Sequence, residues 1–448
     1  MPFNLHWKRI WSERHNKLWV LPALHCVLAV VLALVAAWIP SWLPASWELP
    51  RIEAKTLDSL LTVIASSMLA VATFSLSIMV SAFASASNSV TPRATELVMG
   101  DEGTRTAIAN FLSAFMYSVV AQTALGLKYY GDDGRFILFV GTLVVLVWLM
   151  VTLLRWVRTL SSLGRLGNTL ARVEAAAKAT LETFWQHPLM GARAAPLQLP
   201  ETGHMAPIVA TRMLFVRRID MEALNTIAQT HDCQIHIQKR PGVLVAPGDV
   251  LAWVETQQPW ESAPSWLDEA NAAFHLDRDR TFDQDPRFGV IVLREAAQRA
   301  LSSSVNDPGT AIACLHSLTR VLMESQTNAE QHIMQAAQEQ EGEAAFPPVR
   351  YPHLTMAPLP LEELIRDGFD PIVRDGSDSY EVAVRLQKML GLLHRRTRHP
   401  TLAAAIRSNA EFAYRCAMDL LPHAKDREEV QALHDQYFAK SAVPPSQA

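Results

Sequence analysis

Residues 57–88 read LDSLLTVIASSMLAVATFSLSIMVSAFASASN. No charged residue follows Asp58 in this stretch, and its length exceeds the roughly 20 apolar residues that a membrane-spanning helix needs. Steps of three and four residues along it select small or polar side chains on one helical face: Ser59, Thr62, Ser66, Ala70, Thr73, Ser77, Ser81, Ala84 and Asn88. The opposite face is expected to carry Leu61, Ile64, Leu69, Leu76 and Met79. We call the first set the polar stripe.

Two interpretations of the polar stripe remain open. Membrane helices associate closely through small residues and through hydroxyl bonds between helices, so the stripe suits a packing seam. A row of hydroxyls without fixed charge also suits the wall of a water-filled path, where it replaces part of the hydration of a permeant species. Both hold if the stripes of several subunits meet around a symmetry axis.

The composition fits a membrane part joined to soluble domains. The chain has 448 residues, 50% of them hydrophobic, and a mean hydropathy of +0.09. Its net charge of -4 argues against a general nucleic-acid binder. The cysteines lie far apart, at Cys26, Cys233, Cys314 and Cys416, which predicts buried thiols rather than disulfides or a zinc site.

Three further apolar runs complete a predicted membrane domain of four helices over residues 18–157. Residues 18–39 are flanked by interfacial tryptophans, including Trp19 and Trp38, and a further span follows, so we interpret them as a retained anchor rather than a signal peptide. The third run, 107–127, holds Asn110 and Gln122, whose polar side chains are expected to face protein or water. The fourth run, 136–154, is plainly hydrophobic.

Basic residues predict the orientation in a bacterial inner membrane. Lys8, Arg9 and Arg14 precede the first span within residues 1–17, which suit either a short interfacial helix or a solvated basic leader. Arg155 and Arg158 follow the fourth span. Because cytoplasmic loops carry an excess of lysine and arginine, both termini are expected in the cytoplasm.

The remaining two thirds of the chain are expected to form a cytosolic α+β region that ends in a helical bundle. We expect a helical stalk and linker at 158–200, a small α+β or barrel-like module at 206–260, a mainly helical domain at 264–440 and a flexible tail at 441–448. In the module, Asp220 is a plausible helix N-cap. Turns are expected at Arg240-Pro241-Gly242 and at Pro247-Gly248-Asp249.

A cytosolic polar cluster is the second candidate site. It comprises Asp283, Asp285, Arg287, Asn306 and Asp307. Asp307 followed by Pro308 has the residue types of an N-cap and the first position of a helix, which explains it without any chemistry. Carboxylates also suit a hard cation, but the spacing of a calcium loop is lacking, so no metal and no cofactor are predicted.

Three segments resemble a known family: the second span running into Ser89-Val90-Thr91-Pro92-Arg93, the block Phe111-Leu112-Ser113 with Phe115 and Tyr117, and FDQDPRFGVIVLREAAQRALSSSVNDPGTA at 282–311. They are similar to the bacterial predicted membrane proteins of domain of unknown function 2254. A Ser-Pro-Arg triplet often replaces Thr91-Pro92-Arg93 in that family, and a Ser-Pro pair often replaces Ser302-Ser303. The resemblance implies an integral membrane protein with a large soluble domain and supplies no reaction.

Motifs of enzymes are missing from the sequence. Phosphate-binding loops, dinucleotide-binding glycine patterns and the Gly-x-Ser-x-Gly elbow do not occur. His231, Cys233 and His236 are too closely spaced and too strand-like for a convincing metal site, since His236 would point away from the other two.

The leading functional hypothesis is therefore an oligomeric channel or transport-like protein for a small ion or solute. Its path would be lined by Ser66, Thr73, Ser77 and Ser81 and supported by Asn110 and Gln122. The alternative is a membrane-anchored sensing or scaffolding protein whose cytosolic region binds a ligand or partner. A membrane enzyme that uses a metal between Asp277 and Asp307 is a third hypothesis. The expected partners are the lipid bilayer and further copies of the chain, without nucleic acid.

Overall fold

The computed structural model describes residues 20–39, 50–89, 91–94, 102–160, 165–196, 204–256, 266–339 and 349–438. The predicted interfacial segment 1–17 and the tail 441–448 lie outside these residues. The chain divides into two compact units, Met1–Thr169 and Leu170–Ala448, which we call the N-terminal and C-terminal units.

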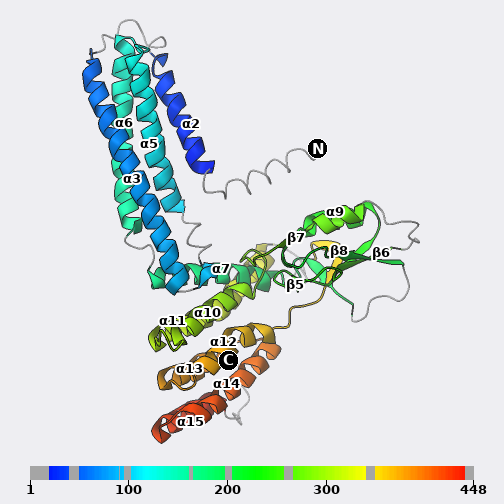
Figure 1. Ribbon diagram of the computed structural model, residues 1–448. Helices are drawn as coiled ribbons and strands as arrows, with labels where there is room; N and C mark the ends of the chain where they lie inside the picture. Colours follow the sequence, from blue (N-terminus) through cyan, green and yellow to red (C-terminus); the bar gives the residue numbers. More distant parts are fainter. Residues whose placement is uncertain are drawn as a thin grey trace. The chain divides into compact units, whose positions relative to one another are not determined.

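The described part of the N-terminal unit is helical, and Figure 1 shows its main helices side by side. They are α2 (Val20–Val35), α3 (Ala54–Ser89), α5 (Glu102–Gly126) and α6 (Asp132–Leu160), with the short 3₁₀ turn η2 (Pro92–Ala94) after α3. Three of them contain stretches that are long and apolar enough to cross a membrane: Ala54–Ser85, Gly103–Gly126 and Asp132–Leu160.

The predicted first span differs from the other three. Within the described residues α2 is a shorter apolar helix of 16 residues. That length is about 24 Å, against a hydrocarbon core of about 30 Å. The described residues therefore contain three candidate membrane helices rather than the four that the sequence predicts, and residues 18 and 19 of the predicted span lie outside them.

Polar and aromatic side chains connect these helices from inside. The hydroxyl of Tyr130 donates to the carbonyl oxygen of Ala33 in α2 at 2.8 Å. The hydroxyls of Tyr117 in α5 and Thr142 in α6 lie 3.2 Å apart, so α5 contacts α6 through a hydrogen bond as well as through apolar packing. Buried hydroxyls that pair with each other avoid the cost of an unsatisfied polar group in an apolar surrounding.

The C-terminal unit contains two sheets. The strands are β1 (Ala192–Ala194), β2 (His204–Val209), β3 (Leu214–Ile219), β4 (Gln234–Ile237), β5 (Leu244–Val245), β6 (Val250–Thr256), β7 (Phe274–Asp277) and β8 (Tyr351–Met356). One sheet has the order β1-β8-β4-β6-β2 and the other has the order β5-β3-β7. Helices α8 (Met221–Thr230) and α9 (Trp266–Ala272) accompany them.

Local sequence signals place the turns of this part. The side chain of Asp220 accepts a hydrogen bond from the backbone nitrogen of Ala223, as an N-cap of α8 does. Gly242 and Gly248 both have φ of +90°, a left-handed conformation that favours glycine, at the two turns that the sequence predicts.

The larger sheet also includes strands from outside the predicted module at 206–260. Strand β8 lies about a hundred residues downstream and pairs in parallel with β4 and with β1. Two parallel strands are joined by a long connection, so no hairpin turn in the sequence predicts that they pair. The module is therefore completed by distant segments.

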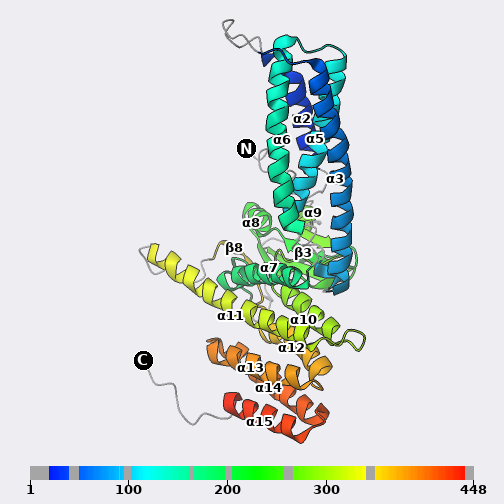
Figure 2. The same cartoon turned by 90° about the vertical axis from the view of Figure 1, so that its left-hand side faces the viewer.

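Helices make up the rest of the C-terminal unit. They are α7 (Leu166–Gln186), α10 (Phe288–Leu301), α11 (Pro308–Glu339), α12 (Glu362–Gly376), α13 (Tyr380–Arg396), α14 (Pro400–Leu420) and α15 (Ala424–Phe438). In Figure 2, α12 and α13 lie next to α10 and α11, and α14 and α15 lie on their far side.

Helix α7 packs into this unit and does not form the separate stalk that the sequence predicts. Its Lys178 pairs with Glu324 of α11 at 2.6 Å, and its Glu174 pairs with Arg320 of α11 at 2.6 Å. Its leucine and valine positions, such as Val173 and Leu181, are buried. The apolar periodicity that suggested a stalk instead marks the face that packs against its neighbours.

Candidate functional site

The polar stripe lies on the exposed face of α3. Ser59, Thr62, Ser66, Thr73, Ser77 and Ser81 are all exposed in the isolated chain, and Asn88 belongs to α3 although its side chain lies outside the described part. The face that packs inside the N-terminal unit is opposite, with buried Leu61, Ile64 and Met79. Among the described residues, α5 reaches the stripe at Thr62 through Gln122, and the stripe serines and threonine from Ser66 to Ser81 are exposed.

Two leucines that the sequence assigned to the opposite face are in fact exposed. Leu69 is 43% and Leu76 is 49% exposed. On a helix with 3.6 residues per turn, both lie about 80 to 100° from the stripe, so they flank it and do not oppose it. The buried face includes a hydroxyl, since Ser75 is only 1% exposed and donates to the carbonyl oxygen of Val71 at 2.6 Å.

Four of the stripe hydroxyls donate to their own helix. Ser59 donates to Lys55, Thr62 to Asp58, and Ser66 to Thr62, each at 2.8 to 2.9 Å from the carbonyl oxygen one turn earlier. Thr73 donates to the carbonyl oxygens of Leu69 and Ala70. Each hydroxyl has one proton, so in these conformations it offers mainly acceptor lone pairs to whatever covers the face.

The two polar residues of α5 have different environments. The amide nitrogen of Gln122 donates to Oδ1 of Asp58 and to Oγ1 of Thr62, both at 2.9 Å, so it extends one end of the stripe. Asn110 is buried, and its amide nitrogen contacts Oγ1 of Thr152 in α6 at 3.3 Å. The structure thus joins Gln122 to the stripe and places Asn110 in the packing between α5 and α6.

The predicted polar cluster, which lies in the C-terminal unit, does not form one site. Asp283 and Asp285 precede α10, whereas Asn306 and Asp307 follow it, and the 14 residues of α10 measure about 20 Å. Asn306 and Asp307 are exposed. Asp307 accepts from the backbone nitrogen and hydroxyl of Thr310, and these hydrogen bonds lower the pKa of its carboxyl. Asp307 is therefore the N-cap of α11, as its sequence context indicates.

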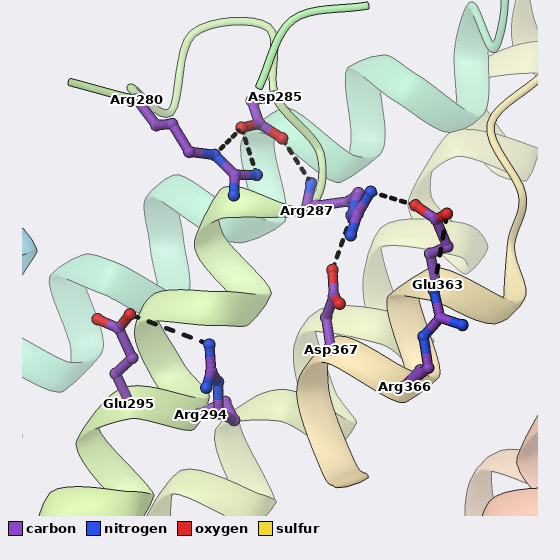
Figure 3. A network of polar contacts seen from close by, with 8 residues as sticks. All are labelled: Arg280, Asp285, Arg287, Arg294, Glu295, Glu363, Arg366 and Asp367. Atoms are coloured by element: carbon purple, nitrogen blue, oxygen red, sulfur yellow. Dashed lines mark hydrogen bonds and ion pairs between the residues drawn. The ribbon is translucent and has the colours of Figure 1, made fainter. Parts of the chain in front are cut away.

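Asp285 instead is the buried member of a partly buried network of ion pairs (Figure 3). It is 2% exposed and accepts from Arg280 at 2.7 Å and from the backbone nitrogen of Arg287 at 3.1 Å. The guanidinium of Arg287 then pairs with Asp367 of α12 at 2.7 Å and with Glu363 of the same helix. Burial raises the pKa of the Asp285 carboxyl against the opposing attraction of Arg280. Asp283 is not part of this chain of contacts and bonds the hydroxyl of Thr281 at 3.3 Å.

This network connects the segment before α10 with α12 and is not arranged to hold a metal. Its carboxylates face guanidinium groups, which already neutralise them. Among the described residues no group of three or more histidine, cysteine, aspartate or glutamate side chains is placed to hold a metal ion. Sequence reasoning missed Glu363 and Asp367 because they lie far from Arg287 along the chain.

The three residues of the short histidine and cysteine motif are separated in the structure. His231 lies at the end of α8 and stacks on Trp266, and Cys233 is buried. His236 lies in β4, 4% exposed, with Nδ1 2.8 Å from the hydroxyl of Thr355 and Nε2 3.0 Å from a carboxylate oxygen of Glu255. It joins β8, β4 and β6 in the centre of the sheet.

Exchanging His236 for phenylalanine is expected to weaken this sheet by about 1.5 kcal/mol. Phenylalanine keeps the ring volume, but it leaves the largely buried Glu255 carboxylate without its imidazole partner. Hydrogen exchange of peptides that cover β4 and β8 measures the loss. His231→Phe, which retains the stacking on Trp266, is the control and should leave exchange unchanged. Equal exchange in both variants would contradict the assigned role.

Comparisons with known proteins agree with the membrane character of the N-terminal unit. The sequence profile of the family described as predicted membrane protein (DUF2254) matches residues 15–391. An uncharacterised protein of Mycobacterium bovis and one of Mycobacterium tuberculosis are each 28% identical over 117 residues. That match covers 26% of this chain and 22% of each relative. No solved structure matches the chain.

Proposed function

The chain belongs to the predicted membrane protein family of domain of unknown function 2254, and from this premise we propose that it is an oligomeric channel or transport protein for a small ion or solute. The observation that carries the proposal is the polar stripe of α3, whose described side chains are exposed and lie opposite the face that packs within the subunit. A polar row within a membrane span is expected to face protein or water rather than lipid.

The chemistry of the stripe favours cations or neutral solutes over anions. The hydroxyls of Ser66 and Thr73 donate to their own helix and leave oxygen lone pairs for the outside. Acceptor oxygens without fixed charge replace the hydration of a cation and hold it weakly enough for it to leave. Stripes from several copies, arranged around an axis, would surround such a path, which is why the proposal includes a homo-oligomer.

Four finer points belong to the same proposal. Helix α2, together with residues that precede it, crosses the membrane as a fourth span. The protein resides in the bacterial inner membrane with both termini and the C-terminal unit in the cytoplasm, as the basic residues near Arg155 favour. The last four helices form a bundle. The protein has no catalytic activity of its own.

Cysteine accessibility tests the stripe. Single cysteines at Ser66, Thr73 and Ser77, in a protein whose four native cysteines are replaced, are expected to react with a membrane-impermeant thiol reagent. Water reaches these positions if the stripe lines a path. The same reagent should then block solute flux through the protein in liposomes.

Three positions serve as matched controls for this labelling. Leu69 and Leu76 are exposed beside the stripe and should stay unlabelled because they face lipid. Ser75 has the same side chain as two of the three labelled stripe positions but is buried on the opposite face, so a cysteine there should stay unlabelled. If no stripe position is labelled and no flux is measured, the stripe is a packing seam without water. That result would favour the alternative function of a sensing or scaffolding protein.

A further inference from the structure

A pocket of about 370 Å³ lies within the C-terminal unit and borders, at Asp283, the polar cluster that the sequence highlights. Its wall comes from the end of α7, the end of β3 with the start of α8, the turn at Arg240, the loop at 283–286, and the start of β8. Four cationic or ionisable basic side chains line it: His187, Arg218, Arg240 and Arg350.

Arg240 is held in place without being neutralised. Its guanidinium donates to the carbonyl oxygens of Ala357 at 2.6 Å and of Pro188 at 2.5 Å. Burial lowers its pKa to about 10. Carbonyl dipoles orient a guanidinium but carry no net charge, so the side chain keeps an uncompensated positive charge beside the pocket.

Arg218 and Arg350, the other two arginines of the pocket, differ in their pairing from two arginines nearby. Arg217, next to Arg218 on β3, pairs with Asp277 at 2.9 Å, and Arg287 pairs with Asp367. Among the described residues, no carboxylate lies within ion-pair distance of Arg218 or Arg350. Arg217 and Arg287 thus pair with carboxylates, whereas Arg218 and Arg350 do not within the described residues.

The acidic residues at the pocket do not cancel this charge by direct contact. One carboxylate oxygen of Asp220 accepts from the backbone nitrogen of Ala223, and Asp283 accepts from Thr281. Glu222 is exposed on the first turn of α8. The remaining wall includes the apolar side chains of Phe184, Met190, Ile219 and Tyr351.

We propose that this pocket binds a small organic phosphate of about nucleotide size. Arginine presents a planar fork that binds phosphate oxygens in pairs, and three arginines line the site. The apolar wall suits the organic part of such a ligand, and the volume lies in the range of small-molecule sites. The proposal extends beyond transport and gives the C-terminal unit a ligand of its own.

The test is calorimetric titration of the full-length protein in detergent with adenosine monophosphate, inorganic phosphate and adenosine. The nucleotide is expected to bind more tightly than inorganic phosphate, and uncharged adenosine is expected to bind far more weakly. Equal binding of adenosine and the nucleotide, or no binding of the nucleotide at millimolar concentration, would overturn the proposal. Because no flux is measured, the outcome is separate from that of the pore proposal.

Charge variants of the full-length protein give the second arm of the test. Arg218→Ala and Arg350→Ala each remove one exposed guanidinium and should weaken nucleotide binding by about tenfold, the value of one charge-assisted hydrogen bond. Glu222→Gln should strengthen it, which no loss of folding would produce. Arg212→Ala, an exposed arginine in the turn before β3 and outside the pocket wall, is the control and should bind as the native protein does. Equal weakening by Arg212→Ala, or no effect of Glu222→Gln, would contradict the proposed site.

Discussion

Replacing Asp285 with alanine is expected to destabilise the C-terminal unit by about 3 to 5 kcal/mol, the cost of removing one partner of a buried ion pair. Asp285 is 2% exposed, and its partner Arg280 has a side chain that is only 18% exposed. The variant would leave that guanidinium next to an empty volume without a counter-charge. Hydrogen exchange of peptides that cover the start of α10 measures the loss as a lower free energy of opening.

Asp277→Ala is the matched control for this variant. Asp277 also pairs with an arginine, Arg217, but both side chains are about two fifths exposed, at 44% and 38%. Exposed pairs contribute at most about 1 kcal/mol because water screens both charges. If both variants lower the free energy of opening by comparable amounts, the contribution of the network in Figure 3 to stability does not depend on burial.

The same aspartate explains a glycine elsewhere in the chain. A Cβ atom at Gly242 would lie 2.2 Å from one carboxylate oxygen of Asp285 and 2.5 Å from its carboxyl carbon. Gly242 also has φ of +90°, so both the turn and the close approach require glycine. Arg240-Pro241-Gly242 predicts the turn from the local sequence. The close approach of the Asp285 carboxylate cannot be predicted in this way, because Asp285 lies 43 positions downstream.

Features set by neighbouring residues could be predicted from the sequence. The caps at Asp220 and Asp307 and the single polar face of α3 each depend on residues within one or two helical turns. The existence of a membrane part and of a soluble part with a sheet follows in the same way from composition and periodicity. These patterns are local, so they are visible without knowledge of the fold.

Features set by distant residues could not be predicted. Strand β8 pairs with β4 across more than a hundred residues, and Arg287 meets Asp367 across 80. The pocket around Arg240 needs five separate segments, none of which has a recognisable motif. The polar cluster was grouped by sequence proximity, but α10 holds its two halves apart. Proximity along the chain predicts proximity in space only when no regular element intervenes.

A side chain at Gly289 is expected to separate two helices of the C-terminal unit. A Cβ atom there would lie 2.3 Å from Cβ and 2.7 Å from Cα of Ala177 in α7. Neither atom can rotate away, because one belongs to the backbone and the other is attached to it directly. Gly289→Leu should therefore cost about 3 kcal/mol or more through overpacking, although leucine favours a helix more than glycine does.

Gly167→Leu separates this steric effect from the change in helix propensity. Gly167 lies on α7 and is exposed, with no atom within 4 Å of the position that its Cβ would take. The substitution should leave α7 unchanged or stabilise it slightly, since leucine has the better helix propensity. Hydrogen exchange of α7 and α10 should then accelerate only in Gly289→Leu. Because Lys178 and Glu174 bond α11 from the same helix, faster exchange should extend to α11 if α7 is a packed part of the unit. If α7 did not pack on α10, Gly289→Leu would meet no atom of Ala177, and exchange would be unchanged in both variants.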